Sequence, residues 1–316
     1  MKFDYKKHLV MLCTVGSRAY GTHTPESDYD YRGALVPPAL CDNGFLHKFE
    51  QKEKLAGYGE DSVAYDLRKF FYLCANCNPN VVECLFAPDD LVVVDTKWGK
   101  LLRENRYKFL SMRAKNSFHG YAYSQLKRMK NHKAWMDQEK SGAVTVERPK
   151  RKDFDLDPNA KYAKEHLQGL MALPQDSLEP SLKDYVAKER AYMAAHNEWA
   201  KWNKWRKNRN PERAAMERKA GYDLKHGMHL VRLLKMCEEL LRDGDLHVRR
   251  PDAKFLLEVR NGSWSYDKLM SWVDEQDELL KTLAKDSTLP KAPDMEYLNN
   301  LCAEMVSGFR QELGDV

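Results

Sequence analysis

The chain has 316 residues, a length that suits two domains or one large domain with insertions. Its 43% hydrophobic content is enough for an apolar core, while its net charge of +5 is too ordinary to establish nucleic-acid binding. No run approaches the roughly 20 apolar residues of a membrane span, so no membrane association is predicted. The seven scattered cysteines favour a reduced, cytoplasmic protein with buried thiols.

The first third of the chain alternates between strand and helix patterns. Apolar, β-branched segments bounded by turn residues predict strands at 8–15, 30–37 and 62–67. Helical spacing predicts a helix over 68–77 that stops at Asn-Pro-Asn. Segment 81–88 fits a short helix or a strand, and 90–95 fits a strand or a loop. These patterns predict an α+β fold in which a small mixed sheet forms the first domain, residues 1–110.

Strand patterns fade after this point, and helical periodicity predicts a mostly α-helical second domain over 111–316. Gly244 suits the C-cap of one helix and Ser265 the N-cap of the next. A polar, weakly periodic insert near 139–180 is predicted to be a long loop, mobile or ordered by a partner. The predicted helices are 99–111, 119–136, 184–208, 223–244, 265–286 and 294–313.

The segment "GSRAYGTHTPESDYDYRG", residues 16–33, combines a Gly-Ser turn with two alternating aspartates. Side chains alternate along a strand, so Asp28 and Asp30 are predicted to share one face. Two such carboxylates suit a hard divalent cation, and a Gly16–Ser17 turn suits a phosphate. The alternative is a surface turn with solvated acids. Because the turn and the Asp-x-Asp pair occur together, we favour the interpretation as a phosphate- and cation-binding site.

This segment resembles the signature of the DNA polymerase β nucleotidyltransferase superfamily in its minimal Gly-Ser…Asp-x-Asp form. It is closest to predicted nucleotidyltransferases of bacteria and phages. Further likeness lies in segments 65–73, 78–88, 118–129, 221–241 and 259–269.

The resemblance implies a palm-like domain whose three carboxylates hold two Mg²⁺ ions, with Mn²⁺ as the alternative. It gives Gly16 and Ser17 a phosphate-holding role and makes Asp28 and Asp30 metal ligands. Arg18 and Arg32 are candidates for holding the triphosphate, or they form structural ion pairs.

The third carboxylate of the implied site comes from a later strand. Asp61 and Asp66 flank the predicted strand at 62–67 and face opposite sides of it, because their separation is odd. Asp61 is our preferred third catalytic acid and metal ligand, and Asp66 is the alternative. Glu83 is a weaker candidate, with packing or capping as its expected role.

The helical domain carries candidate partner-binding residues. Trp199, Trp202 and Trp205 form a stripe interleaved with basic residues that include Lys204 and Arg206. The stripe can stack bases, or it can pack against a neighbouring helix.

The resemblance also makes Lys225 and His226 nucleotide-binding candidates in the cleft between the domains. Tyr121 and Gln125 either face the same cleft or pack between helices. His226 and His229, three residues apart, could share a helix face, although no third metal ligand lies near them in the sequence.

These patterns predict a Mg²⁺-dependent nucleotidyltransferase that transfers NMP from a nucleoside triphosphate, such as ATP, to an acceptor hydroxyl. The expected acceptor is a tRNA-like RNA 3′ end. Transfer to a protein side chain or a small molecule is one alternative. A non-catalytic RNA- or partner-binding module is another. The oligomeric state stays open.

Overall fold

A computed structural model describes residues 3–43, 46, 48–140, 147–158, 169, 172–173, 179–209 and 211–315. The contacts divide the chain into two compact units: unit 1, residues 1–130 with 220–316, and unit 2, residues 131–219. The boundary predicted at residue 110 therefore lies within unit 1. The insert predicted near 139–180 lies largely outside the described residues.

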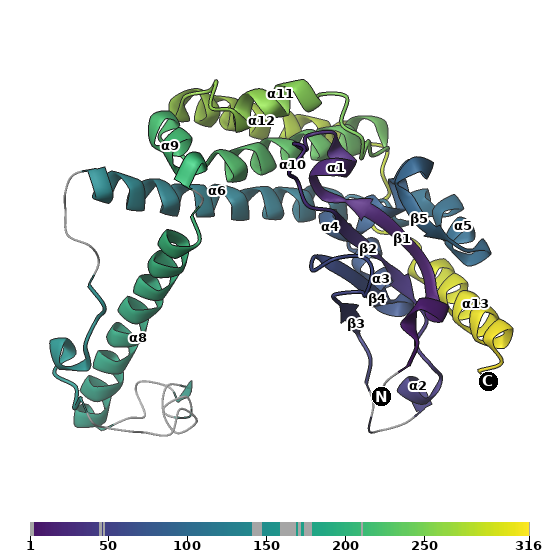
Figure 1. The fold of residues 1–316 in the computed structure, drawn as a ribbon, viewed down its shortest axis with the longest axis horizontal. Coiled ribbons are helices and arrows are strands. Elements are labelled where there is room, and N and C mark those ends of the chain that lie inside the picture. Colours follow the sequence, from purple (N-terminus) through teal and green to yellow (C-terminus); the bar gives the residue numbers. More distant parts are fainter. Residues whose placement is uncertain are drawn as a thin grey trace. The chain divides into compact units, whose positions relative to one another are not determined.

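Unit 1 is built on a five-stranded mixed sheet with the order β3-β4-β2-β1-β5, which confirms the α+β fold class (Figure 1). The pair β2–β4 is parallel, and β1–β2, β1–β5 and β3–β4 are antiparallel. The three predicted strands are confirmed, and 90–95 contains a fourth strand, β5. The bounds are β1 Leu9–Val15, β2 Asp30–Leu35, β3 Gln51–Glu53, β4 Ser62–Asp66 and β5 Val92–Asp95. We did not predict β3, since its three polar residues carry no apolar pattern.

Both faces of the sheet are covered by apolar side chains. On one face, Leu12 and Leu35 pack with Leu55 in a small cluster. On the other face, Val10 and Cys13 join the large core shared with the helices of unit 1. Strand β1 is buried along its whole length because it has a strand on each edge and an apolar cluster on each face. The strand that leads to the Gly-Ser turn is thus fixed on all sides.

The helices of unit 1 follow the predicted periodicity. Gly244 ends α10 in the left-handed conformation, at φ 64°, and the Ser265 hydroxyl accepts the Lys268 N–H at the start of α12, so both predicted caps are confirmed. Segment 81–88 is helical, which settles that alternative. The α-helices are α1 Gly16–Tyr20, α2 Leu40–Asn43, α3 Leu67–Ala75, α4 Pro79–Val82, α5 Lys97–Glu104, α10 Leu224–Asp243, α11 Ala253–Arg260, α12 Tyr266–Asp286 and α13 Met295–Leu313. The 3-10 helices are η1 Tyr5–His8, η2 Glu83–Phe86, η3 Asp89–Leu91 and η4 Arg106–Phe109.

Helix α6, Arg113–Lys140, has residues in both units. Unit 2 further contains η5 Arg151–Phe154, α8 Pro180–Lys207 and most of α9, Pro211–Ala220. Within the described part of the chain, no helix is both long enough and apolar enough to cross a bilayer. All seven cysteines are free and buried, as the sequence indicated.

Candidate active site

A cavity of about 700 Å³ opens in unit 1 where β1 ends and β2 begins, with α6 and α10 contributing the opposite wall. Four acidic residues line it: Asp30, Glu53, Glu60 and Asp61. Five basic residues line it as well: Arg32, Lys54, Arg128, Lys225 and Arg232. This mixture suits a ligand that carries negative charge together with a cation.

The backbone of Gly16 lies directly against the side chain of Asp30 in this site. Val15 and Asp30 are paired across β1 and β2, so the chain turns into α1 directly beside the Asp30 carboxylate. Gly16 has φ 72°, and a Cβ atom on it would overlap Oδ2 of Asp30. Both the backbone conformation and the space therefore require glycine here.

Asp28 does not lie in the strand, so the prediction that it shares a strand face with Asp30 was wrong. Strand β2 begins at Asp30, because β1 ends at Val15 and no strand residue remains opposite Asp28. Asp28 is exposed, and with Asp61 it lines a smaller neighbouring pocket.

The three aspartates are nevertheless electrostatically linked. The pKa of Asp30 is raised, first by burial and then by the charges of Asp61 and Asp28, while Arg32 and Lys225 act against this increase. Asp61 also links the other two aspartates in space, because it lines the main cavity with Asp30 and the smaller pocket with Asp28.

The other two acidic candidates make contacts outside this group. Asp66 caps α3 by accepting the Arg68 N–H at 2.8 Å, and it also binds the Arg68 guanidinium. Glu83 is buried and accepts the Tyr20 hydroxyl at 2.8 and 3.0 Å. Among the three candidates for the third acid, Asp61 is the one that lines the cavity with Asp30.

Ser17 and Arg18 are not among the residues that line the cavity. The Ser17 carbonyl accepts the Thr22 N–H. Arg18 donates to the Ser27 carbonyl from Nε and Nη2, at 3.1 and 2.6 Å, and stacks on Tyr29. Its observed role is to hold the loop that carries Asp28.

Lys225 and His226 of α10 line the cavity, and so do Tyr121 and Gln125 of α6. His226 is positioned from two sides: its backbone N–H is accepted by Asp223, and its Nδ1 lies 2.8 Å from Gln125 Oε1. Lys225 is exposed at the start of the helix.

Sequence reasoning missed His229 and Arg232 as cavity residues. A signal was present, since Lys225, His229 and Arg232 follow the i, i+4, i+7 spacing of one helix face. Burial and the charges of Arg232 and Lys225 hold the pKa of His229 well below its usual range. Its imidazole is therefore neutral at pH 7 and only a weak proton acceptor.

The tryptophan stripe lies in unit 2 and is used largely for packing. Trp202 is 5% exposed, and Trp205 has its ring centroid 5.3 Å from that of Trp135. Lys204 and Arg206 are exposed. Of the two interpretations of the stripe, helix packing describes Trp202, whose indole is too buried to stack on a base.

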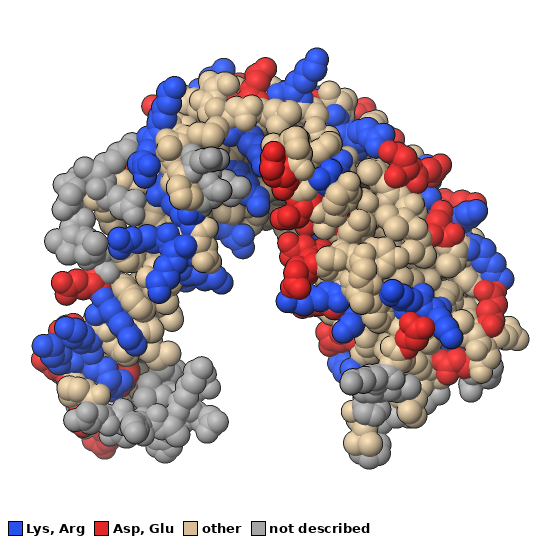
Figure 2. All heavy atoms as spheres, in the orientation of Figure 1, with Lys and Arg blue, Asp and Glu red and all other residues tan. Residues whose placement is uncertain are grey.

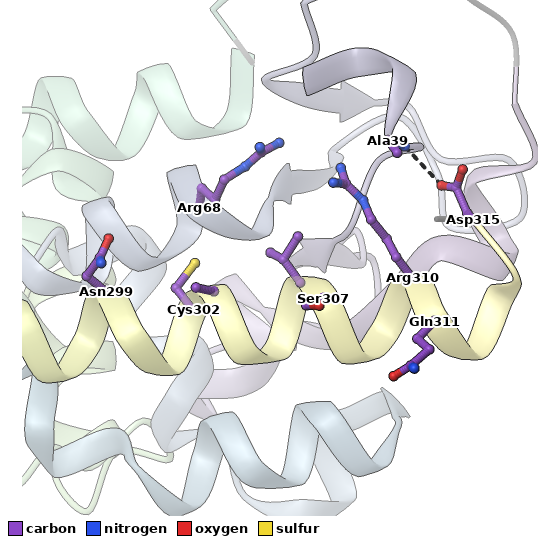
Figure 3. A pocket seen from close by; sticks show the side chains of 10 residues that line it. Ala39, Arg68, Asn299, Cys302, Ser307, Arg310, Gln311 and Asp315 are labelled. Atoms are coloured by element: carbon purple, nitrogen blue, oxygen red, sulfur yellow. Dashed lines mark hydrogen bonds between the residues drawn. The ribbon is translucent and has the colours of Figure 1, made fainter. Parts of the chain in front are cut away.

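A second cavity of unit 1, about 530 Å³, lies beside α13 (Figure 3). Arg68 and Arg310 approach it from two helices, and each binds one oxygen of Asp42 at 2.5 Å. Burial alone would raise the pKa of Asp42, but hydrogen bonds from the two arginines lower it. These charges are matched to one another, which is typical of a structural ion cluster.

Residues 2–146 match the family described as the RNA repair pathway DNA polymerase beta family. The chain is also 24% identical to an uncharacterized 38.9 kDa protein of the nrdC-mobD intergenic region of Enterobacteria phage T4. That alignment covers 89% of this chain and 92% of the phage protein. No solved structure matches the chain significantly. The family match supports a polymerase β-like relationship and a nucleotidyltransferase-like role.

Proposed function

We propose that the protein is a metal-dependent nucleotidyltransferase that transfers NMP from a nucleoside triphosphate to an acceptor hydroxyl and releases pyrophosphate. One observation carries the proposal: Gly16 is pressed against the Asp30 carboxylate in a cavity that Asp61 and Lys225 also line. The similarity of residues 2–146 to a polymerase β family supports the same chemistry.

The acidic group fits a divalent cation. Burial and the neighbouring charges of Asp61 and Asp28 make the ionised form of Asp30 costly, as its raised pKa shows. Mg²⁺ prefers such carboxylate oxygens and would relieve this repulsion, and Mn²⁺ takes similar ligands. When bound, the ion would lower the pKa of the acceptor hydroxyl and neutralise charge on pyrophosphate.

The basic side chains supply the complementary half of the site. Lys225 and Arg32 favour the ionised form of Asp30 and would also bind phosphate oxygens of the nucleotide. Gln125 holds the His226 ring at the same wall. These residues would orient the triphosphate toward the carboxylates.

An RNA 3′ end is the acceptor that we propose. Residues 131–219 contain 19 of the 52 lysines and arginines but 14 of the 47 aspartates and glutamates, so this segment carries the whole net charge of +5. Figure 2 shows basic side chains gathered along α8, which includes the exposed Lys204 and Arg206. Such a surface attracts a polyphosphate backbone, and the matched family is described as an RNA repair family.

The test uses α-labelled nucleoside triphosphates, beginning with ATP, and Mg²⁺, supplied separately with total RNA, cell protein and small metabolites. We expect label in the RNA pool together with pyrophosphate. Label in protein or metabolites would instead support transfer to a side chain or a small molecule. Mg²⁺-independent, salt-sensitive RNA binding without turnover would identify a non-catalytic module.

The acids are tested by substitution. Asp30→Asn and Asp61→Asn should lower turnover at least about a hundredfold, because metal ligands supply several kcal/mol to the transition state. Asp66→Asn should lower stability and retain turnover, since Asp66 caps α3. Glu26→Gln, an exposed acid in the Asp28 loop, is the matched control. Unchanged pyrophosphate release in both Asp28→Asn and Asp30→Asn would refute the proposal.

A further inference from the structure

Arg232 lines the cavity as an almost fully buried cation. It lies on α10 and is only 4% exposed, yet few of its donors are used. Nη1 lies 3.1 Å from the sulfur of Met236 and 3.7 Å from Glu83, while Nε has no hydrogen-bond partner among the described residues. A thioether is a weak acceptor, and a guanidinium has five N–H donors, so burial in this state is costly.

The surroundings hold the guanidinium in place but satisfy few of its hydrogen-bond donors. Its central carbon lies 4.0 Å from the Tyr20 ring centroid, which fixes the plane of the group. The nearby carboxylate, Glu83, is directed to the Tyr20 hydroxyl, with which it makes its two shortest contacts. Tyr20 therefore orients both charged groups, and the Glu83–Arg232 ion pair, at 3.7 Å, is too long to include a hydrogen bond.

A second arginine adds to the positive charge of this wall. Arg32 lines the same cavity from β2 and donates from Nη1 to the Asn80 carbonyl at 3.3 Å, a neutral acceptor. Glu83 lies near both guanidinium groups, and Asp30 also offsets the charge of Arg32. The unused donors of Arg232 are what a site for an anion provides.

We propose that Arg232, together with Arg32, binds the terminal phosphate of the nucleoside triphosphate and selects triphosphates over diphosphates. The proposal rests on the proposed nucleotidyltransferase function and names the residues that recognise the end of the polyphosphate. A guanidinium fork matches two phosphate oxygens, and the buried setting strengthens each charge-assisted hydrogen bond. The terminal phosphate would supply the acceptors that Arg232 lacks.

The binding experiment uses the full-length chain in EDTA, with inorganic tripolyphosphate as the probe and titration calorimetry as the readout. Arg232→Met should weaken tripolyphosphate binding at least about tenfold, because charge-assisted bonds are lost. With Mg²⁺, the same substitution should lower the ratio of ATP affinity to ADP affinity by a similar factor and leave AMP binding unchanged. Arg242→Met is the matched control on α10, since Arg242 binds Glu238 and does not line the cavity.

Arg232→Met could unfold the chain by leaving Glu83 buried beside an apolar group. The double variant Glu83→Gln, Arg232→Met removes both charges and should show the same loss of tripolyphosphate binding. Wild-type affinity for tripolyphosphate in either folded variant, or an unchanged ATP-to-ADP ratio, would overturn the proposal. Arg232-dependent tripolyphosphate binding without NMP transfer would support the subsite and refute the proposed function, so the two failures are distinguishable.

Discussion

Units 1 and 2 differ in how much apolar core they bury. Unit 1 has a continuous aliphatic and aromatic core that joins the sheet to its helices. Unit 2 buries few apolar side chains among its described residues, and basic side chains lie over its rings, such as Arg209 over Trp205 and Arg206 over Trp202. Its buried residues include Met136, Leu156, Val186, Glu189, Trp202, Ala214 and Glu217.

The charges divide in the same way. Unit 1 contains 33 basic and 33 acidic residues, and the excess of positive charge lies in residues 131–219. A neutral unit with a dry core can hold carboxylates and guanidinium groups in fixed positions, which catalysis requires. A basic unit with long polar helices is suited to contacts with a polyanion. Under the proposed function, unit 1 carries out the chemistry and unit 2 binds the RNA.

The largest effect is expected at Gly16, which lies in unit 1, the proposed catalytic part. Gly16→Ala should lower turnover at least about a hundredfold, because the methyl group displaces the Asp30 carboxylate by a fraction of an ångström or more. Gly221→Ala is the matched control: Gly221 has φ 84° but open space around a Cβ. Steady-state pyrophosphate release measures both. Equal losses in the two variants would mean that backbone strain alone, not the contact with Asp30, explains the effect.

A pair of methionines on one helix tests the difference in packing. Met129 and Met136 both lie on α6 and are 0% and 2% exposed, but the first belongs to unit 1 and the second to unit 2. Met129→Ala should cost about 2–5 kcal/mol of unfolding free energy, since close-packed neighbours cannot fill the cavity. Met136→Ala should cost less, because the side chains of unit 2 have more freedom to relax.

Urea unfolding combined with hydrogen exchange on peptides from each unit separates these two costs. A larger cost for Met136→Ala would contradict the comparison, because it would show that unit 2 is as tightly packed as unit 1.

The smallest effect is expected for single charges of unit 2. Lys204→Gln or Arg206→Gln should weaken RNA binding a few-fold at low salt and reduce the slope of log K against log salt by about 1 each. Lys285→Gln, in the last turn of α12 in unit 1, is the matched control and should change neither quantity. Filter binding across a salt series gives the slope. Equal effects of the three substitutions would remove the distinction between a recognition unit and a catalytic unit.

Sequence patterns predicted most of the regular elements because local periodicity and caps reflect interactions within one segment. The helix of 224–243 and its Gly244 cap are examples, as are the strands at 9–15 and 62–66. The same reasoning missed β3, where three polar residues pair only because β4 offers a free edge. It also placed Asp28 in a strand. The turn at Gly16 ends β1, so no strand residue pairs with Asp28.

The sequence by itself determined the fold class and marked Gly16, Asp30 and Asp61, together with Ser17 and Asp28, as site candidates, since each lies in or beside a locally defined turn or strand. Only the tertiary structure decided that Asp61, and not Asp66, shares the cavity with Asp30. It alone revealed Arg232 as a buried cation with unused donors. The physical reason is that burial and hydrogen-bond satisfaction depend on neighbours distant in the chain, which no local pattern encodes.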